Sequence, residues 1–410
     1  MVIMNKYIQD ILNKLSPNSY IVGGAVRDIV LGKIPHDIDI TTDLLPREIL
    51  EVFPTGNIIG KRFGTVIVDT PYGTVDVTTM RRDITPGTHP DVAFTTDLHT
   101  DLARRDFTIN AMAMTVDDKL IDPFGGLNDC YFKFIRAVGN PIDRIHNEDP
   151  RRAFRAARIA AQTKFTIVDN LRCAIFDADI SEIDGDFIRT ELLKGLKYNP
   201  RGMIENWVNL NLMAKVIPEF LVLHICEHNL KHHPEGAADV HTLYALEHSG
   251  QATLNELVAI FLHDIGKSRT KVGLSYHGHA KEGVIIATDI LKRLKFSKAD
   301  TNEILFCIEN HMKMHIISEM RKAKRYALYD SPYFNSLLTV HMADTFNREN
   351  MRDFILNDIP ARMPDRLVNG HDLIALGLPA DKTLGPILKE LYEIQIEEGI
   401  EDKVILLEYL

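Results

Sequence analysis

Two short motifs near the start of the sequence contain residue types that bind phosphate and a divalent metal ion. Gly23 and Gly24 follow an apolar strand and precede a predicted helix that includes Arg27. Adjacent glycines let the backbone approach an anion, a helix start offers free N–H groups, and an arginine adds a bidentate charge. Side chains alternate along a strand, so Asp37 and Asp39 share one face and suit Mg²⁺. The two motifs predict a phosphate cradle beside a magnesium site.

A third carboxylate, that of Asp76, could lie beside this pair. Residues 66–68 and 75–77 are apolar apart from Asp76, and they flank Thr70-Pro71-Tyr72-Gly73, which is a turn composition. The pattern predicts a hairpin in which Asp76 faces away from its valine neighbours. From the pattern alone, Asp76 either joins the carboxylate pair or lies exposed on the hairpin.

Glu148-Asp149-Pro150 opens a second charged motif, which is rich in arginine. Pro150 fits the first position of a helix. At about 100° per residue, the arginines of this helix fall within roughly 120°, and Phe154 lies on the other side with several alanines. An arginine face without interleaved lysine or glutamate favours a polyanion-binding surface over a solvated stripe. The arginines concerned are Arg151, Arg152, Arg155 and Arg158.

A histidine cluster in the second half of the chain predicts a metal site of another kind. His263 and Asp264 follow the apolar run 257–262, which places them at the end of a buried helix. Imidazole and carboxylate together suit a transition-type divalent ion, which polarises phosphate and activates water. Hydrolysis of a phosphomonoester or cyclic phosphodiester is the chemistry expected, and the alternative is a helical domain with satisfied core histidines. The candidate partners are His241, His277, His279, His311 and Asp344.

Length and composition describe the setting of these motifs. A chain of 410 residues is too long for one core, and two to four domains are expected. No apolar run has the length of a membrane span, and the first residues lack a signal-peptide core. Four scattered cysteines indicate reduced thiols, so we expect a cytoplasmic protein. The net charge of −10 argues against a non-specific nucleic-acid binder, so any polyanion must meet a local basic patch.

The elements that position the motifs follow from local patterns. Residues 42–53 resemble a capped helix, and residues 81–97 are polar and interrupted by prolines, which indicates a mobile loop. A helical spacer is expected from about 170 to 220, and helices separated by Gly377 and Pro379 are expected near the end of the sequence.

The sequence resembles the class II tRNA nucleotidyltransferases and bacterial poly(A) polymerases. The resemblance rests on four motifs in this order: Gly23-Gly24-Ala25-Val26-Arg27-Asp28, Asp37-Ile38-Asp39, Arg104-Arg105-Asp106 through Asn110-Ala111, and Glu148-Asp149 to Arg152. The later part resembles the HD domain of one bacterial branch of CCA-adding enzymes. The residues that match it are His241-Thr242-Leu243, His263-Asp264-Ile265-Gly266-Lys267, Tyr276-His277-Gly278-His279 and Asp344.

The resemblance implies an α+β fold. A polymerase-β-like nucleotidyltransferase head, made of a small mixed sheet with helices, is followed by an all-helical neck and body and a helical HD domain. The expected domains are a head at 1–140, a neck and body with the nucleotide-selecting helix at 141–225, an HD domain at 226–350 and a helical tail at 351–410.

The resemblance also implies roles for single residues of the head. Asp37 and Asp39 would bind the catalytic Mg²⁺, and Asp76 falls at the position of the family's third acidic residue. Asp149 and Arg152 would pair with the incoming base, which suits the Watson–Crick edges of C and A. The remaining nucleotide contacts implied are Gly23, Gly24 and Arg27 on the triphosphate, Arg105, Asp106 and Asn110 on sugar and phosphates, and Arg155 and Arg158 on phosphates.

The expected reaction is addition of C, C and A to a tRNA 3′ end from CTP and ATP, by attack of the 3′-hydroxyl on the α-phosphorus. The HD site would remove phosphate or open a 2′,3′-cyclic phosphate at damaged tRNA ends, using a metal such as Ni²⁺ or Mn²⁺. Its expected ligands are His241, His263, Asp264 and Asp344, with His279 and His311 as second-metal or phosphate contacts.

Two alternatives stay open at this point. One is a poly(A) polymerase with the same head, and the other is an HD phosphohydrolase whose head only binds RNA. The oligomeric state, monomer or homodimer, is also open.

Overall fold

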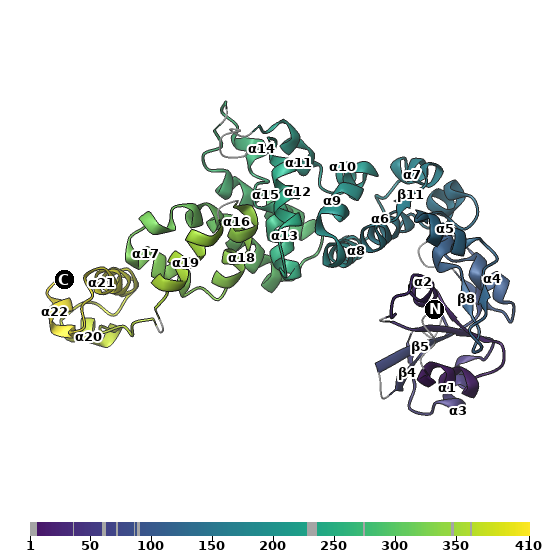
Figure 1. Ribbon diagram of the computed structural model, residues 1–410. Coiled ribbons are helices and arrows are strands. Elements are labelled where there is room, and N and C mark those ends of the chain that lie inside the picture. Colours follow the sequence, from purple (N-terminus) through teal and green to yellow (C-terminus); the bar gives the residue numbers. More distant parts are fainter. Residues whose placement is uncertain are drawn as a thin grey trace. The chain divides into compact units, whose positions relative to one another are not determined.

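The computed structural model (Figure 1) describes residues 6–35, 37–59, 63–70, 73–85, 87, 91–227, 236–273, 275–345, 348–360 and 363–410. The chain forms two compact units, Met1–Pro218 and Glu219–Leu410. The finer division predicted from the sequence, with boundaries after 140, 225 and 350, stays a prediction. Within the described ranges, no helix combines the length and the apolar character needed to cross a lipid bilayer.

A mixed sheet forms the centre of the first unit. Its strand order is β3-β4-β5-β2-β1-β8-β9, in which only β2 and β5 run parallel among the described pairs. The α+β head expected from the sequence is therefore confirmed. The strands are β1 Ser19–Val22, β2 Asp39–Thr42, β3 Asn57–Ile59, β4 Thr65–Thr70, β5 Gly73–Thr79, β8 Ala113–Met114 and β9 Leu120–Ile121.

The predicted hairpin is confirmed, because β4 and β5 pair antiparallel with Thr70 opposite Gly73. Exposure alternates as expected over residues 37–40, where Ile38 and Ile40 are buried and Asp39 is exposed, but the alternation ends there, because Thr41 and Thr42 are buried as well. The apolar side chains of these strands pack into the head core, and this packing sets which face carries the acidic residues.

Short helices surround the sheet. The helix that follows the glycine pair ends before Gly32, which has a φ of 73° and so fits a helix stop. These helices are α1 Lys6–Lys14, α2 Gly24–Val30, α3 Pro46–Val52, α4 Leu98–Ala103 and α5 Gly126–Phe132.

The stretch 81–97 differs from the loop that was predicted. Strands β6 Arg81–Asp83 and β7 Val92–Phe94 pair antiparallel, so this segment contains a two-stranded ribbon. Two strands of three residues each are too short to show a strand pattern in a segment where turn residues dominate, so the sequence predicted a loop. Pro86 and Pro90 lie outside the described residues.

The helices that follow the head form the rest of the first unit. The arginine-rich helix α6 spans Arg152–Thr163, two residues later than Pro150 suggested, and packs against α8 and α9. Phe154 on α6 meets Trp207 on α9 edge to face, with ring centroids 5.5 Å apart. The other elements here are a π-helical turn Asp143–Glu148, the paired strands β10 Phe134–Ile135 and β11 Thr166–Ile167, and helices α7 Asp169–Phe176, α8 Gly185–Tyr198, α9 Pro200–Asn209 and α10 Leu212–Val216.

The second unit is helical (Figure 1), as expected. Helix α13 is almost wholly buried and ends at the predicted His-Asp pair. The helices are α11 Pro218–Leu221, α12 Ala238–Glu247, α13 Leu254–Leu262, α14 Lys267–Thr270, α15 His279–Arg293, α16 Lys298–His315, α17 Lys322–Tyr329, α18 Phe334–Asp344, α19 Arg348–Asp358, α20 Gly370–Ala375, α21 Leu384–Glu398 and α22 Lys403–Leu407.

Candidate active sites

The three acidic residues of the head come from neighbouring strands. Asp39 begins β2, and the parallel register places it directly beside Asp76 of β5. Although Asp39 as a whole residue is exposed, the atoms around its carboxylate exclude water and raise its pKa; Asp76 and Asp37 raise this pKa further, while Arg105 opposes the rise. Burial and Asp37 also raise the pKa of Asp76. The carboxylates therefore repel one another, and a divalent cation would relieve that repulsion. Asp76 thus lies beside the pair, which resolves the alternative that the sequence left open.

These three carboxylates are less tightly gathered than the histidine groups of the second unit. The described residues contain three groups of His and Asp ligand atoms lying within 4.8 Å of one another, and all three groups are in the second unit. The carboxylates of the head nevertheless supply only hard oxygen ligands, the set that Mg²⁺ prefers.

Gly23 shapes the opening next to Asp39. Its φ of 74° is one that L-residues rarely adopt. A Cβ atom at this position would lie 3.1 Å from Arg105 Nη1 and 3.4 Å from Asp39 Oδ2. A side chain at this position would therefore narrow the space between the backbone, the carboxylate and the guanidinium.

Arg27 does not face this opening freely. Its side chain is only 4% exposed and donates to Asp28 Oδ1 at 2.8 Å and to Asn110 Oδ1 at 2.9 Å. These two partners take up the fork that the sequence assigned to a triphosphate, and Arg27 is absent from the residues that line the adjoining cleft. In the described structure Arg27 holds Asn110, which does line that cleft.

Asp101 ties the arginines of the head together. This buried carboxylate, which the sequence reasoning missed, accepts from Arg104 Nη2 at 2.9 Å, from Arg105 Nη2 at 3.2 Å and from the backbone N–H of Arg81 at 3.2 Å. Burial raises the pKa of Asp101, but the two arginines outweigh it, and the pKa lies below its ordinary value. Its position one helical turn before the Arg-Arg pair was the signal in the sequence.

The arginines of α6 pair with carboxylates rather than forming an open polyanion-binding face. Arg152 donates through Nε to Asp106 Oδ1 at 2.7 Å, and Arg155 donates through Nη2 to Asp149 Oδ2 at 2.8 Å. Arg158 donates through Nε to Glu191 Oε2 at 2.6 Å. Carboxylates distant in the sequence therefore fold against this arginine face, and polyanion binding by it stays a prediction.

Asp149 and Arg152 both lie at the wall of one cleft. Arg151 and Arg155 hold the two oxygens of Asp149, and Glu148 lies 2.5 Å from Arg152 Nη1. The cleft has a volume of about 890 Å³, and its lining joins the glycine pair to the start of α6. The predicted site residues that line it are Gly23, Gly24, Asp39, Arg105, Asp106, Asn110, Asp149, Arg152 and Arg155. Arg27, Asp37, Asp76 and Arg158 do not belong to this lining.

Three histidines of the second unit are fixed by backbone carbonyls. The Nδ1 atoms of His263, His279 and His311 lie 2.7, 2.9 and 2.8 Å from the carbonyl oxygens of Ile260, Tyr276 and Ile308. An Nδ1–H donated to a carbonyl leaves the Nε2 lone pair free for a metal ion. All three rings are buried.

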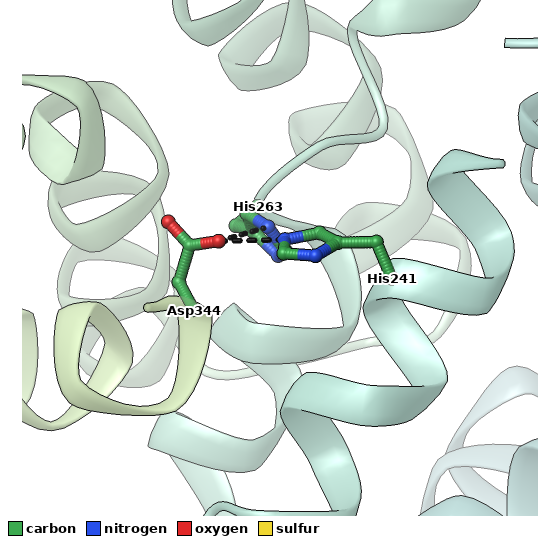
Figure 2. Close-up of side chains that lie close together, drawn as sticks. All are labelled: His241, His263 and Asp344. Carbon is green, nitrogen blue, oxygen red and sulfur yellow. Dashed lines mark hydrogen bonds and ion pairs between the residues drawn. The ribbon is translucent and has the colours of Figure 1, made fainter. Parts of the chain in front are cut away.

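Asp344 gathers the first group of ligands. Its Oδ1 lies 2.6 Å from His241 Nε2 and 3.4 Å from His263 Nε2, so one oxygen faces both rings (Figure 2). Burial opposes protonation of His263, but Asp264 and Asp344 outweigh it and raise the pKa of His263 to about 10. The ligand atoms of these three residues form one group. They are three of the four ligands predicted for the HD site, and the fourth, Asp264, belongs to another group.

Asp264 belongs to a second group. Lys267, one turn further along the chain, lies with Nζ 2.5 Å from Asp264 Oδ2, while Oδ1 lies 3.4 Å from His279 Nε2 and 3.8 Å from His311 Nε2. Asp264 still touches the first group, since its Oδ2 is 3.4 Å from His263 Nε2. The contact with Lys267 orients this carboxylate toward His279 and His311. These two histidines lie on different helices, α15 and α16, so helical spacing in the sequence did not indicate that they meet.

The donor atoms of these groups fit divalent metal ions. His263 Nε2 is buried without a hydrogen-bond partner, and the Nε2 atoms of His279 and His311 lie 3.0 Å apart. Because both rings donate Nδ1–H to a carbonyl, two neutral rings would present two lone pairs to each other, and either a proton on one Nε2 or a bound metal ion satisfies them. Nitrogen and oxygen donors together match transition-type divalent ions.

Two histidines of this region were missed by the sequence reasoning. His315 and His341 form a third group with Asp344. His315 lies one turn after His311 on α16, and His341 lies one turn before Asp344 on α18, so helical spacing was the available signal. His277, a candidate in the sequence, is exposed and belongs to none of the three groups among the described residues.

Comparisons with known proteins identify two families of domains in this chain. A poly(A) polymerase head domain model matches residues 19–136, and an HD domain model matches residues 230–349. The multifunctional CCA protein of Neisseria gonorrhoeae is 30% identical over 353 residues, which cover 81% of this chain and 84% of that protein. The CCA-adding enzyme of Lactobacillus gasseri is 28% identical over 402 residues, which cover 95% of this chain and 92% of that protein. The match to the CCA-adding enzyme of Lactobacillus helveticus, at 38% identity, spans about half of either chain, 49% and 52%.

Solved structures share the fold. The Bacillus stearothermophilus CCA-adding enzyme in complex with CTP has a TM-score of 0.67 and 21% identity, with 98% of this chain and 97% of that chain covered. The Thermotoga maritima CCA-adding enzyme complexed with tRNA has a TM-score of 0.64 and 21% identity, with 99% and 95% covered.

Proposed function

Because the chain belongs to the family of CCA-adding enzymes, we propose that it adds C, C and A to the 3′ ends of tRNA from CTP and ATP. No nucleic-acid template takes part. The observation that carries this proposal is that Asp39, Asp149 and Arg152 all line the same cleft. A cleft with a catalytic carboxylate at one end and a base-reading pair at the other suits selection and transfer of a nucleotide.

The head residues have defined tasks in this reaction. Asp37 and Asp39 would bind Mg²⁺, with Asp76 as the third acidic residue. The ion, when bound, supplies positive charge for the triphosphate. Arg105 stands beside Asp39 and binds phosphate oxygens, while Gly23 keeps the path between them open. The tRNA 3′-hydroxyl attacks the α-phosphorus and pyrophosphate leaves, so positioning and charge stabilisation carry the catalysis.

Asp149 and Arg152 would select the base. A carboxylate accepts from the exocyclic amine of C or A, and an arginine donates to an acceptor of the same edge, whereas U and G present other patterns. Arg155 fixes Asp149, and Asp106 and Glu148 fix Arg152, so both groups are held in place before a nucleotide enters, and the base would replace part of these contacts. Pre-organised donors and acceptors lose little freedom when the base binds.

The HD unit supports a second activity on the same substrate. We propose that it hydrolyses a terminal phosphate or a 2′,3′-cyclic phosphate at tRNA ends, with a transition-type divalent ion such as Ni²⁺ or Mn²⁺. His241, His263 and Asp344 would hold one ion, and Asp264, His279 and His311 a second. Such ions polarise a phosphate and supply a nucleophile at neutral pH.

Separate substitutions test the two activities. Asp39→Asn should abolish nucleotide addition and leave phosphohydrolase activity, while Asp264→Asn should do the reverse. Asp69→Asn is the matched control, because Asp69 is exposed on β4 of the same sheet. Loss of both activities in either single variant, with the fold intact by circular dichroism, would show that the two sites are not independent.

A further inference from the structure

The third histidine group in the second unit has a different set of ligands from the two sites assigned above. His341 lies on α18, one turn before Asp344, and His315 ends α16. A ring nitrogen of each histidine and a carboxylate oxygen of Asp344 lie within 4.8 Å of one another. The two rings meet edge to face with centroids 4.9 Å apart.

Asp344 divides its two oxygens between two groups. Oδ1 faces His241 and His263, as described above, whereas Oδ2 lies 3.0 Å from His315 Nε2. A carboxylate that offers one oxygen to each side is the usual bridge between paired divalent ions, which lie about 3.5–4 Å apart in two-metal sites.

His341 carries the argument for a bound ion. Its side chain is only 2% exposed, and its Nδ1 is buried without a hydrogen-bond partner. Burying a polar nitrogen without a partner is unfavourable, because its hydrogen bond to water is lost and not replaced. The hydrogen bond between His315 and Asp344 explains the position of His315 but leaves this nitrogen of His341 unsatisfied.

We propose that His315, His341 and Asp344 bind an auxiliary divalent transition-metal ion, bridged through Asp344 to the ion of His241 and His263. Two imidazoles and one carboxylate oxygen favour such an ion over Mg²⁺ or Ca²⁺. His315 is 32% exposed, so solvent or a phosphate oxygen reaches the ion from this side. The auxiliary ion adds positive charge next to the proposed hydrolytic centre.

Nickel stoichiometry of the full chain tests the proposal without reference to activity. Metal-stripped protein is dialysed against Ni²⁺, and the metal bound per chain is measured by mass spectrometry. We expect His341→Gln and His315→Gln each to bind one Ni²⁺ fewer than the natural chain. His371→Gln, at an exposed histidine of α20, is the control for adventitious surface binding and should match the natural chain.

A double variant separates the auxiliary ion from its neighbour, because the two share Asp344. His241→Gln should remove one Ni²⁺, and His241→Gln with His341→Gln should remove two. If the double variant loses only one, or if His341→Gln binds as much as the natural chain, the auxiliary ion does not exist.

Circular dichroism establishes that each variant is folded. Should His341→Gln unfold, His315→Gln carries the test by itself, because this side chain is partly exposed and a glutamine amide still donates to Asp344.

Discussion

Replacing Gly23 by alanine tests how the head cleft is built. The Cβ atom would stand 3.1 Å from Arg105 Nη1 and 3.4 Å from Asp39 Oδ2. The φ of 74° with ψ of −139° at Gly23 lies outside the regions that L-residues favour, which is a second penalty of about 1–3 kcal/mol. Gly32→Ala is a matched control, since Gly32 has a φ of 73° but a Cβ there meets no described atom within 4 Å. Both variants should therefore lose stability, but only Gly23→Ala should disturb the site.

The magnitude follows from how far Arg105 must move. At 3.1 Å the guanidinium has to shift by a few tenths of an ångström, and displacements of about 1 Å in a catalytic array cost about 100-fold in rate. We expect kcat/KM for CTP addition to fall about tenfold, which corresponds to about 1.4 kcal/mol of transition-state stabilisation. Single-nucleotide addition to a shortened tRNA measures this, alongside thermal unfolding. If Gly23→Ala adds nucleotides as fast as Gly32→Ala at equal stability, the cleft does not bind triphosphate at Gly23.

Three further predictions concern buried charges and metal ions. Asp101→Asn removes the buried carboxylate that Arg104 and Arg105 share, so the free energy of unfolding measured in urea should fall by about 3–5 kcal/mol; an unchanged unfolding midpoint would refute this role. Burial raises the pKa of Asp106, but Arg155 and Arg152 outweigh it and hold that pKa below its ordinary value. Its stabilisation is therefore present above the unfolded pKa of about 3.9 and is lost as pH falls through the folded value, so Asp106→Asn should flatten the acid limb of melting temperature against pH. Ni²⁺ at about 100 times its Kd should stabilise the stripped chain by about 2.7 kcal/mol per ion, and His311→Gln should reduce this gain; an equal gain would exclude His311 as a ligand.

The local parts of both sites could be predicted from the sequence. Alternation over residues 37–40 placed Asp39 on the face opposite Ile38 and Ile40, and the turn composition of the sequence after Thr70 predicted the β4–β5 hairpin that carries Asp76. An apolar run of helical length placed His263 and Asp264 at the end of α13. In each case a period of two or of 3.6 residues determined the position of the side chain.

Partnerships between distant residues could not be predicted in the same way. The pairing of Arg152 with Asp106 joins residues 46 positions apart, and that of Arg158 with Glu191 joins residues 33 apart. Helical periodicity fixes which face an arginine occupies but contains no information on which carboxylate packs against it. For the same reason, the sequence could not predict that His315 and His341 lie together, because they are on separate helices.

The central claim is that this chain completes the CCA end of tRNA. The most direct measurement incubates the purified chain with Mg²⁺, CTP, ATP and tRNA transcripts that lack one, two or three terminal nucleotides, and reads product lengths on a sequencing gel. We expect every transcript to grow to the complete CCA end and stop there. A long ladder of added A residues would instead identify a poly(A) polymerase, and no extension at all would contradict nucleotide addition by this head.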